Sequence, residues 1–439
     1  MHSLPDLQQV LNNCKIPALL PLQEHAMAAF SKPDDIRIQS PTGTGKTLAY
    51  LLPLLQHLQI DKPGVQCLVM APSRELVLQI VQVWKQMNTG VKCVGCYGGH
   101  PFQTEVNQLQ ELPLLLVGTP GRLADHLKRE NLTLSQVQTI IVDEFDKCLD
   151  QGFEEEMKTL FSYLPPLVRK VFVSATQQTP VPAFAAVKQL QLVTGNESKE
   201  ALPVQMFLVN ASSKDKIDTL FMLLCSLKKE QAIVFCNHRD AVDRTVNLLH
   251  EKGIDAAFLH GGMEQSEREQ AMVRFSNGTL GFMIATDLAS RGLDIPTLQN
   301  VIHYHLPTSE EAWIHRNGRT ARMNRGGTVY LLLHPDETIP DYLEEVPDEK
   351  KLDYTYPLPP KSKWETLFIN GGRKDKISKV DIVGFLHHQG QLKKDQVGIV
   401  IVKDHSSFVA VHRAAIREML PKIKNARIKG VKYTVAVAR

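Results

Sequence analysis

Two short segments of this 439-residue chain carry residue types that suit nucleotide hydrolysis. The first, residues 40–47, reads Ser-Pro-Thr-Gly-Thr-Gly-Lys-Thr. In so small and glycine-rich a loop, successive backbone N–H groups can turn toward a polyphosphate. Lys46 can then reach the outer phosphates, and the Thr47 hydroxyl can bind a magnesium ion. The segment therefore predicts a phosphate site, although Ser40 stands where the usual pattern begins with glycine.

The second segment, residues 140–146, is an apolar run that ends in carboxylates, Ile-Ile-Val-Asp-Glu-Phe-Asp. It predicts a buried β-strand that brings Asp143 beside the magnesium ion and Glu144 to the position of an attacking water. An acidic pair after a strand would on its own be an ordinary solvated strand end. Together, in this order and about a hundred residues apart, the two segments predict an ATPase that uses ATP and Mg²⁺.

The elements that must position these residues follow a repeating pattern. Short apolar runs alternate with longer amphipathic stretches at residues 67–70, 114–117, 140–142 and 171–173. After a polar linker at residues 194–200 the pattern resumes at 232–235, 256–259, 281–284, 301–304 and 329–333. Continuously apolar strands separated by helices indicate parallel sheets covered on both faces. We therefore expect two tandem α/β domains.

The last part of the chain has a different character. An acidic stretch that we expect to be helical and a proline-rich segment, residues 356–360, lead into it. Strands are predicted at residues 366–369, 397–402, 408–411 and 434–437, and helices at 379–387 and 413–423. The order β-α-β-β-α-β is the ferredoxin-like α+β unit that RNA-recognition modules share.

Charge and cysteine content narrow the class of protein. Residues 361–439 hold 17 Lys or Arg against 6 Asp or Glu, a balance of +11, whereas the remaining residues balance at −8. So basic a segment indicates a nucleic-acid partner, a soluble basic tail being the alternative. The seven scattered cysteines suit a reducing cytoplasm, and Cys93 and Cys96 have no second pair for zinc. Neither a secretory signal nor a membrane span is expected.

At this point the chain resembles the DEAD-box RNA helicases through about ten ordered motifs. Gln23 matches the glutamine with which that family reads adenine, since an amide can donate and accept together. Residues 143–146 stand at the motif that names the family, with Phe145 in place of alanine. The nucleotide contacts implied are Gln23, Thr42, Gly43, Thr44, Gly45, Lys46, Thr47 and Asp294, with Thr47 and Asp143 on Mg²⁺. The catalytic residues implied are Lys46, Asp143, Glu144, Arg319 and Arg322.

The resemblance also implies how hydrolysis is linked to RNA. Arg319 and Arg322 match arginine fingers, which neutralise charge on the transferred phosphoryl group. They belong to the second domain, so catalysis requires the two domains to close. Residues implied to couple hydrolysis to strand separation are Asp146, Ser174, Thr176 and His315. Residues implied to grip one RNA strand by its phosphates and sugars are Arg74, Gly98, Gly99, Thr119, Arg122, Arg268 and Thr286.

The C-terminal segment resembles the RNA-binding domain of the DbpA branch of that family. The branch uses this domain to dock on 23S ribosomal RNA during large-subunit assembly. Around residues 407–412 the segment offers one aromatic, so base stacking on the sheet is doubtful. Basic side chains are expected to dominate RNA binding, with Arg373, Lys374, Arg427 and Lys429 among them.

The combined interpretation is an ATP-dependent RNA helicase that disrupts duplexes locally. We expect RecA-like domains at residues 1–195 and 204–345 and an RNA-binding domain at 364–439, in a cytoplasmic monomer that binds 23S ribosomal RNA or pre-50S particles. Two alternatives stay open: an ATP-gated RNA clamp with weak ATPase activity, and an RNA chaperone driven by the basic tail. Phe145 is the reason to retain the clamp as an alternative, because its ring either crowds the coupling residues, which would weaken the ATPase activity, or simply fills a gap. Ala321 replaces the glycine between the finger arginines.

Overall fold

The computed structural model describes residues 4–40, 44–175, 179–195, 204–287, 298–318, 327–343, 345–353 and 355–438. The chain forms two compact units. Of the described residues, those at 4–195 and 313–318 lie in the first unit, and those at 204–312 and 327–438 lie in the second. Within the described ranges, no helix has both the length and the apolar composition that a bilayer crossing requires.

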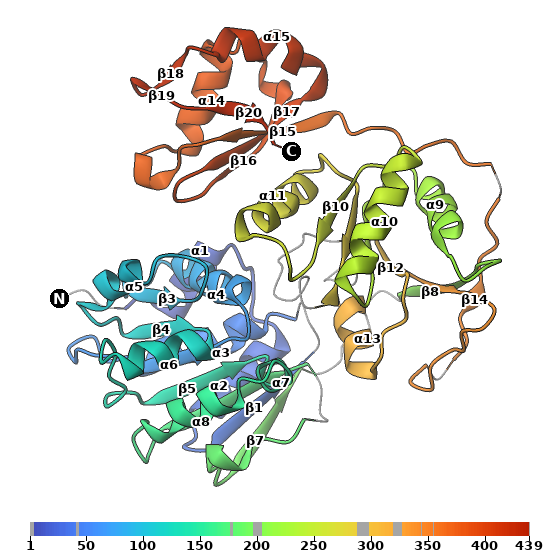
Figure 1. Ribbon diagram of the computed structural model, residues 1–439. Helices are drawn as coiled ribbons and strands as arrows, with labels where there is room; N and C mark the ends of the chain where they lie inside the picture. The colour runs from blue at the N-terminus through green and yellow to red at the C-terminus, as the bar shows by residue number, and fades with distance from the viewer. Residues whose placement is uncertain are drawn as a thin grey trace. The chain divides into compact units, whose positions relative to one another are not determined.

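A seven-stranded parallel sheet forms the centre of the first unit (Figure 1). Its strands are β1 (Asp35–Gln39), β2 (Cys67–Met70), β3 (Cys93–Cys96), β4 (Leu115–Gly118), β5 (Thr139–Asp143), β6 (Arg169–Ser174) and β7 (Leu190–Thr194). Their order across the sheet is β3-β4-β2-β5-β6-β1-β7. β2, β4 and β5 are buried along their whole length, as a parallel sheet covered on both faces requires.

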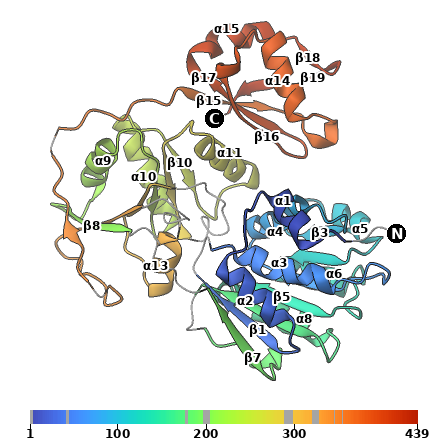
Figure 2. The same ribbon diagram turned by 180° about the vertical axis from the view of Figure 1, so that it is seen from behind.

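Helices cover both faces of this sheet (Figures 1 and 2). One core contains residues of α1 (Leu7–Cys14), α2 (Pro21–Phe30), α3 (Lys46–His57) and α4 (Arg74–Met87). The other contains residues of α5 (Phe102–Leu109), α6 (Pro120–Lys128), α7 (Phe145–Asp150), α8 (Glu154–Ser162) and the short η1 (Ala183–Ala185). The carboxyl ends of the parallel strands therefore lie at one edge, where ligands bind in folds of this kind.

The second unit begins with another seven-stranded parallel sheet. Its strands are β8 (Gln205–Asn210), β9 (Ala232–Phe235), β10 (Ala256–Leu259), β11 (Phe282–Ala285), β12 (Asn300–His303), β13 (Thr328–Leu333) and β14 (Asp348–Glu349). Their order is β10-β11-β9-β12-β13-β8-β14. Among the described residues, its helices are α9 (Ile217–Ser226), α10 (Arg239–Glu251) and α11 (Gln265–Ser276). A further helix, α13 (Glu310–Asn317), begins in the second unit and continues from Trp313 in the first.

The C-terminal part of the second unit is a four-stranded antiparallel sheet with two helices. It comprises β15 (Trp364–Ile369), η2 (Arg373–Asp375), α14 (Lys379–His388), η3 (Lys394–Gln396), β16 (Val397–Val402), β17 (Ser407–His412), α15 (Arg413–Ile423) and β20 (Val435–Val437). The strand order β16-β17-β15-β20 places the first and third strands in the centre. A hairpin of β18 (Arg427–Ile428) and β19 (Val431–Lys432) precedes the last strand.

The predicted fold class is confirmed: two parallel sheets of the RecA-like kind precede a small α+β domain. Cys93 and Cys96 lie in β3, as expected for thiols of a strand, and all seven cysteines are free. The prediction of an acidic helix before the proline-rich segment is wrong. The described residues between 334 and 353 contain only turns and β14, because prolines 335, 340 and 347 interrupt any helix.

Candidate active site

The predicted phosphate loop joins β1 to the first turn of α3. Lys46 is the first residue of α3, and its Nζ donates to the carbonyl of Ser40 at 2.8 Å. Ser40 Oγ donates to Thr44 Oγ1 at 2.7 Å, which ties the two ends of the loop together. A helix that begins here directs backbone N–H groups and its positive dipole end toward a phosphate. Two predicted contacts lie outside the described residues, Thr42 and Gly43.

Position 45 requires glycine because of its backbone conformation and because Gln23 lies close to it. Its φ of +81° is left-handed, and a Cβ there would lie 2.6 Å from Gln23 Nε2. Gln23 is only 2 % exposed; its Oε1 accepts from the Leu20 N–H at 2.9 Å and its Nε2 lies 3.5 Å from the Gly45 carbonyl. The structure thus brings the predicted adenine contact against the phosphate loop.

Asp143 is the last residue of β5 and is 3 % exposed. The hydroxyl of Tyr50 donates to its Oδ2 at 2.8 Å, and the Glu144 N–H donates to its Oδ1 at 3.0 Å. Burial and then Asp143 raise the pKa of Tyr50, and Thr47 opposes this, so the Tyr50 hydroxyl interacts with both predicted magnesium ligands. Burial and then the neighbouring Glu144 raise the pKa of Asp143 to about 6, although Lys46 opposes this.

Glu144 lies in the left-handed region, with φ of +48°, at the position before α7. A non-glycine residue there carries backbone strain, which is often found at functional sites. The next side chain, Phe145, is fully buried in the core and meets Phe172 edge-on at 5.5 Å. Arg37 lies over the Phe145 ring at 5.3 Å. The ring thus fills core space behind the strand end, which favours the gap-filling alternative over crowding.

Three of the predicted coupling residues are described. Asp146 and Ser174 are fully buried, and the Ser174 carbonyl accepts from the Ser40 N–H at 3.2 Å. His315 belongs to the first compact unit, and within it His315 Nε2 lies 3.6 Å from Asp146 Oδ2. The fourth coupling residue, Thr176, lies outside the described residues.

The predicted RNA-gripping residues of the first unit lie together at the carboxyl ends of β2, β3 and β4. Arg74 Nη1 donates to the Gly99 carbonyl at 3.2 Å, and the guanidinium lies 5.0 Å over the Tyr97 ring. Gly99 has φ of +85°, and a Cβ there would lie 2.7 Å from Arg74 Nη1. The Thr119 N–H donates to the Cys96 carbonyl at 3.0 Å, which joins the segment containing Arg122 to the same edge.

In the seven-stranded sheet region of the second unit, two predicted RNA contacts are described. Thr286 follows β11, and its N–H donates to the carbonyl of Leu259 at the end of β10 at 3.1 Å. Arg268 lies in the first turn of α11, which follows β10. Both residues are therefore close to the carboxyl edge of their own sheet. The remaining predicted residues of the second domain lie outside the described residues: Asp294, Arg319 and Arg322.

Comparison with known proteins identifies the family. Residues 20–183 match the DEAD/DEAH box helicase family, 215–324 the helicase conserved C-terminal domain, and 366–437 the DbpA RNA binding domain. The chain is 32 % identical to ATP-dependent RNA helicase DbpA of Escherichia coli (strain K12), with 98 % of this chain and 97 % of that protein aligned. The chain belongs to the DEAD-box family of ATP-dependent RNA helicases.

Other members of the DEAD-box family agree with this result. ATP-dependent RNA helicase DbpA of Bacillus subtilis (strain 168) is 28 % identical, over 94 % of this chain and 93 % of that protein. S. cerevisiae Dbp5 bound to RNA and ADP BeF3 matches with a TM-score of 0.66 and 26 % identity, over 76 % of this chain and 88 % of that one. Mss116p bound to ssRNA and AMP-PNP matches with a TM-score of 0.67 and 26 % identity, over 76 % of this chain and 73 % of that one. DEAD-box helicases hydrolyse ATP, and this chain is an enzyme of that family.

The predicted basic residues of the DbpA-type domain differ in the partners that they have. Arg373 pairs with Asp404 at 2.8 Å, and Lys429 Nζ lies 2.8 Å from Asp381 Oδ2. That lysine and the Ser378 hydroxyl lower the pKa of Asp381 to about 2. Arg427 Nη1 donates to the Gly430 carbonyl at 3.4 Å. The fourth predicted residue, Lys374, lies in η2 and is exposed.

The sheet of the DbpA-type domain offers little aromatic surface. Phe368 and Phe408 are paired on adjacent strands with ring centroids 5.5 Å apart, but Phe408 is only 3 % exposed. On the same face Thr366 is fully buried, and its hydroxyl bonds to Asn277 Nδ2 and to Thr279 Oγ1, each at 2.8 Å. Thr366 and Phe408 are therefore closed to a base, and the aromatic side chains of this face that keep some exposure are the half-buried Trp364 and Phe368.

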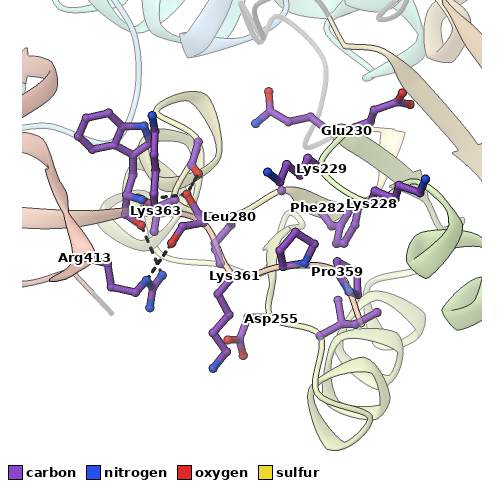
Figure 3. A pocket seen from close by; sticks show the side chains of 18 of the residues that line it. Lys228, Lys229, Glu230, Asp255, Leu280, Phe282, Pro359, Lys361, Lys363 and Arg413 are labelled. Carbon is purple, nitrogen blue, oxygen red and sulfur yellow. Dashed lines mark hydrogen bonds between the residues drawn. The ribbon is translucent and has the colours of Figure 1, made fainter. Parts of the chain in front are cut away.

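A cavity of about 580 Å³ lies in the second unit where the linker meets the C-terminal domain (Figure 3). Its basic lining residues are Lys228, Lys229, Lys361, Lys363 and Arg413, against the acidic Glu230 and Asp255. Arg413 Nε donates to the Ser362 carbonyl at 3.0 Å, so this side chain also holds the linker in place. The cavity adds to the positive character of the chain near the DbpA-type domain.

The sequence patterns did not single out Tyr50, the side chain that joins Thr47 to Asp143. A signal was present, because Tyr50 follows Thr47 by one helical turn and is the polar position in an otherwise apolar stretch of α3. Its buried hydroxyl needs a partner, and the carboxylate supplies one.

Proposed function

We propose that this DEAD-box enzyme disrupts RNA duplexes locally and acts on 23S ribosomal RNA during assembly of the large ribosomal subunit. The observation that carries the proposal is the match of residues 366–437 to the DbpA RNA binding domain. The balance of +11 from residue 361 onward supports an RNA partner for that domain. Two DbpA helicases align with nearly the whole chain, which supports a shared substrate class.

The ATP site that we propose follows from the geometry of the first unit. Lys46 and the N-terminus of α3 hold the phosphates, and Glu144 orients the attacking water. Thr47 and Asp143 fit a magnesium ion, since Asp143 is a buried carboxylate whose raised pKa shows too little compensating charge. Bound Mg²⁺ would supply that charge and neutralise the phosphates.

We further propose that RNA binding and hydrolysis depend on domain closure. Arg319 and Arg322 complete the ATP site when the two RecA-like domains close. Arg74, Arg122 and the glycines at 98–99 hold one strand by its backbone, so the grip is independent of sequence. Closure bends that strand away from its partner, and hydrolysis reopens the domains.

The assignment of domains and of cellular context is part of the same proposal. We place the RecA-like domains at residues 1–195 and 204–345 and the RNA-binding domain at residues 364–439. Exposed basic side chains of the last domain, rather than stacked aromatics, select the ribosomal RNA. The working form is a monomer in the cytoplasm.

Steady-state ATPase activity tests this proposal, measured without RNA, with unstructured RNA and with 23S ribosomal RNA, beside a Glu144→Gln control. Selective stimulation by the ribosomal RNA is the expected result. Equal stimulation by every RNA would leave a general helicase and overturn the ribosomal substrate. Activity no higher than that of the control would favour the ATP-gated clamp.

Duplex length gives a second test of the mechanism. Local disruption predicts that unwinding weakens as a duplex becomes longer than one binding site, because a longer duplex re-forms after each cycle. Unwinding that is independent of duplex length would instead indicate translocation along the strand.

A further inference from the structure

Glu105 is a charged side chain with no exposed surface. It lies in α5, outside every segment that carries the nucleotide chemistry. A buried carboxylate is costly unless hydrogen bonds and opposite charge compensate it fully. What surrounds Glu105 therefore shows what its burial stabilises.

Both oxygens of Glu105 are occupied by donors. Oε1 accepts from the Tyr97 N–H at 2.8 Å and lies 3.0 Å from His100 Nε2. Oε2 accepts from Arg122 Nε at 2.6 Å and lies 2.7 Å from His126 Nε2. The first two donors flank the pair of glycines at 98–99, and the other two lie in α6. One carboxylate thus joins both segments that we assign to RNA binding.

The same cluster fixes the direction of the Arg122 guanidinium. Its Nη2 donates to the His100 carbonyl at 3.4 Å, and it lies 4.5 Å over the Phe102 ring. That ring stacks on His126 with centroids 4.4 Å apart. The Arg122 side chain is 16 % exposed, so part of it still reaches solvent at the strand edge. Charge-assisted hydrogen bonds of this kind hold an arginine in one orientation.

A metal site is the alternative interpretation of this cluster. Among the described residues, Cys96, Glu105 and His126 could offer ligand atoms within 4.8 Å of one another. However, both oxygens of Glu105 already accept from donors, and a cation would have to displace the guanidinium of Arg122. Burial raises the pKa of Glu105, but the hydrogen bonds from His126, Tyr97 and Arg122 outweigh this effect and bring the pKa below its ordinary value. The carboxylate is therefore already compensated.

We propose that Glu105 is a positioning residue for RNA binding, which holds Arg122 and the 98–99 loop in one rigid arrangement facing the RNA backbone. This inference rests on the proposed function, because it takes those segments as the RNA grip. A preorganised grip loses less conformational entropy when the strand binds. Glu105 itself does not touch RNA and takes no part in ATP hydrolysis.

The test is Glu105→Gln in the full-length chain, which keeps the shape and one acceptor but removes the charge. RNA-stimulated ATPase activity is measured over a range of unstructured RNA concentrations. We expect the KM for RNA to rise on the order of tenfold, as the loss of a charge-assisted hydrogen bond implies. The kcat at saturating RNA should stay within about twofold, because the reacting groups are not changed.

Glu111→Gln is the matched control, since Glu111 is 88 % exposed and pairs with Lys92 at 3.3 Å. It should leave the KM for RNA unchanged. A double-mutant cycle with Arg122→Lys gives a readout that a merely structural role would not produce. If Glu105 acts through Arg122, the double variant should be little worse than Arg122→Lys alone.

Two results would overturn the inference: an unchanged KM in a folded Glu105→Gln variant, or fully additive effects in the cycle. If Glu105→Gln does not fold, Glu105→Asp is measured in its place; it keeps the charge and should retain much of the wild-type affinity for RNA. A folded Glu105→Asp variant with weak affinity for RNA also counts against a role for the charge. The proposed function fails separately, if the wild-type enzyme shows no stimulation by RNA.

Discussion

Replacement of Asp143 by Asn should stabilise the nucleotide-free protein above neutral pH. Asp143 is 3 % exposed, and burial with the nearby Glu144 raises its pKa from 3.8 to about 6. An acid whose pKa is raised by folding is less stable when ionised in the folded chain than in the unfolded chain. An amide at the same position carries no charge and avoids this penalty.

The expected size follows from the pKa and from the hydrogen bonds. A difference of about 2 pKa units corresponds to about 3 kcal/mol of destabilisation when the group is ionised in both states. Asn keeps only one of the two oxygens that accept from Tyr50 and from the Glu144 N–H, and the lost hydrogen bond costs about 1 kcal/mol. The net gain in the free energy of unfolding is about 2 kcal/mol near pH 8.

The gain should depend on pH in a defined direction. As the pH falls through 6 toward 3.8, the folded carboxylate takes up its proton before the unfolded one does, so the penalty disappears. The advantage of Asn therefore falls to less than about 1 kcal/mol near pH 5. Scanning calorimetry of the metal-free protein in EDTA, at several pH values, measures both numbers.

An exposed carboxylate of the same domain provides the control. Asp61→Asn should change the free energy of unfolding little, because this side chain is exposed. If Asp143→Asn destabilises the protein equally near pH 8 and near pH 5, the buried charge is not the cause, and the reasoning is refuted. With Mg²⁺ and ATP present the order should reverse, because only the carboxylate gains from the cation.

Three further predictions concern residues that the structure describes. Glu144→Gln should abolish ATP hydrolysis yet retain ATP binding, and turnover near the wild-type rate would exclude its role in orienting water. Phe145→Ala should lower the free energy of unfolding by about 3–5 kcal/mol in urea titrations, because it leaves a cavity beside Phe172. An unchanged midpoint would show that the core closes around the smaller side chain. Thr366→Val should cost about 1–3 kcal/mol, since Asn277 is left buried without its partner, whereas a neutral effect would mean that water replaces it.

Much of the fold could be predicted because buried parallel strands are short, continuous apolar runs. Residues 67–70, 232–235 and 397–402 are strands with the predicted bounds. The two-residue strand β14 could not be predicted, since it forms only by pairing with β8. The acidic stretch before it misled the prediction, because composition favoured a helix that its prolines forbid.

The candidate site could not be predicted from the sequence where its contacts join residues far apart in the chain. The phosphate loop and the acidic strand end are local patterns, so their residues could be named from the sequence. Tyr50 and Glu105 are functional candidates only through partners that the fold brings to them. Glu105 is one acidic residue in a polar helix, and nothing in that helix distinguishes it from an exposed carboxylate.

Two of the buried carboxylates of the first unit, Glu105 and Asp143, differ in a way that separates binding from scaffolding. Glu105 has donors on both oxygens, among them a guanidinium, and its pKa is below the ordinary value. Asp143 receives one hydroxyl and one backbone N–H, faces Glu144, and has a raised pKa. A fully compensated charge gains nothing from a cation, whereas an under-compensated one does. The balance of donors, rather than burial alone, therefore supports our proposal that Asp143 and not Glu105 binds a metal ion.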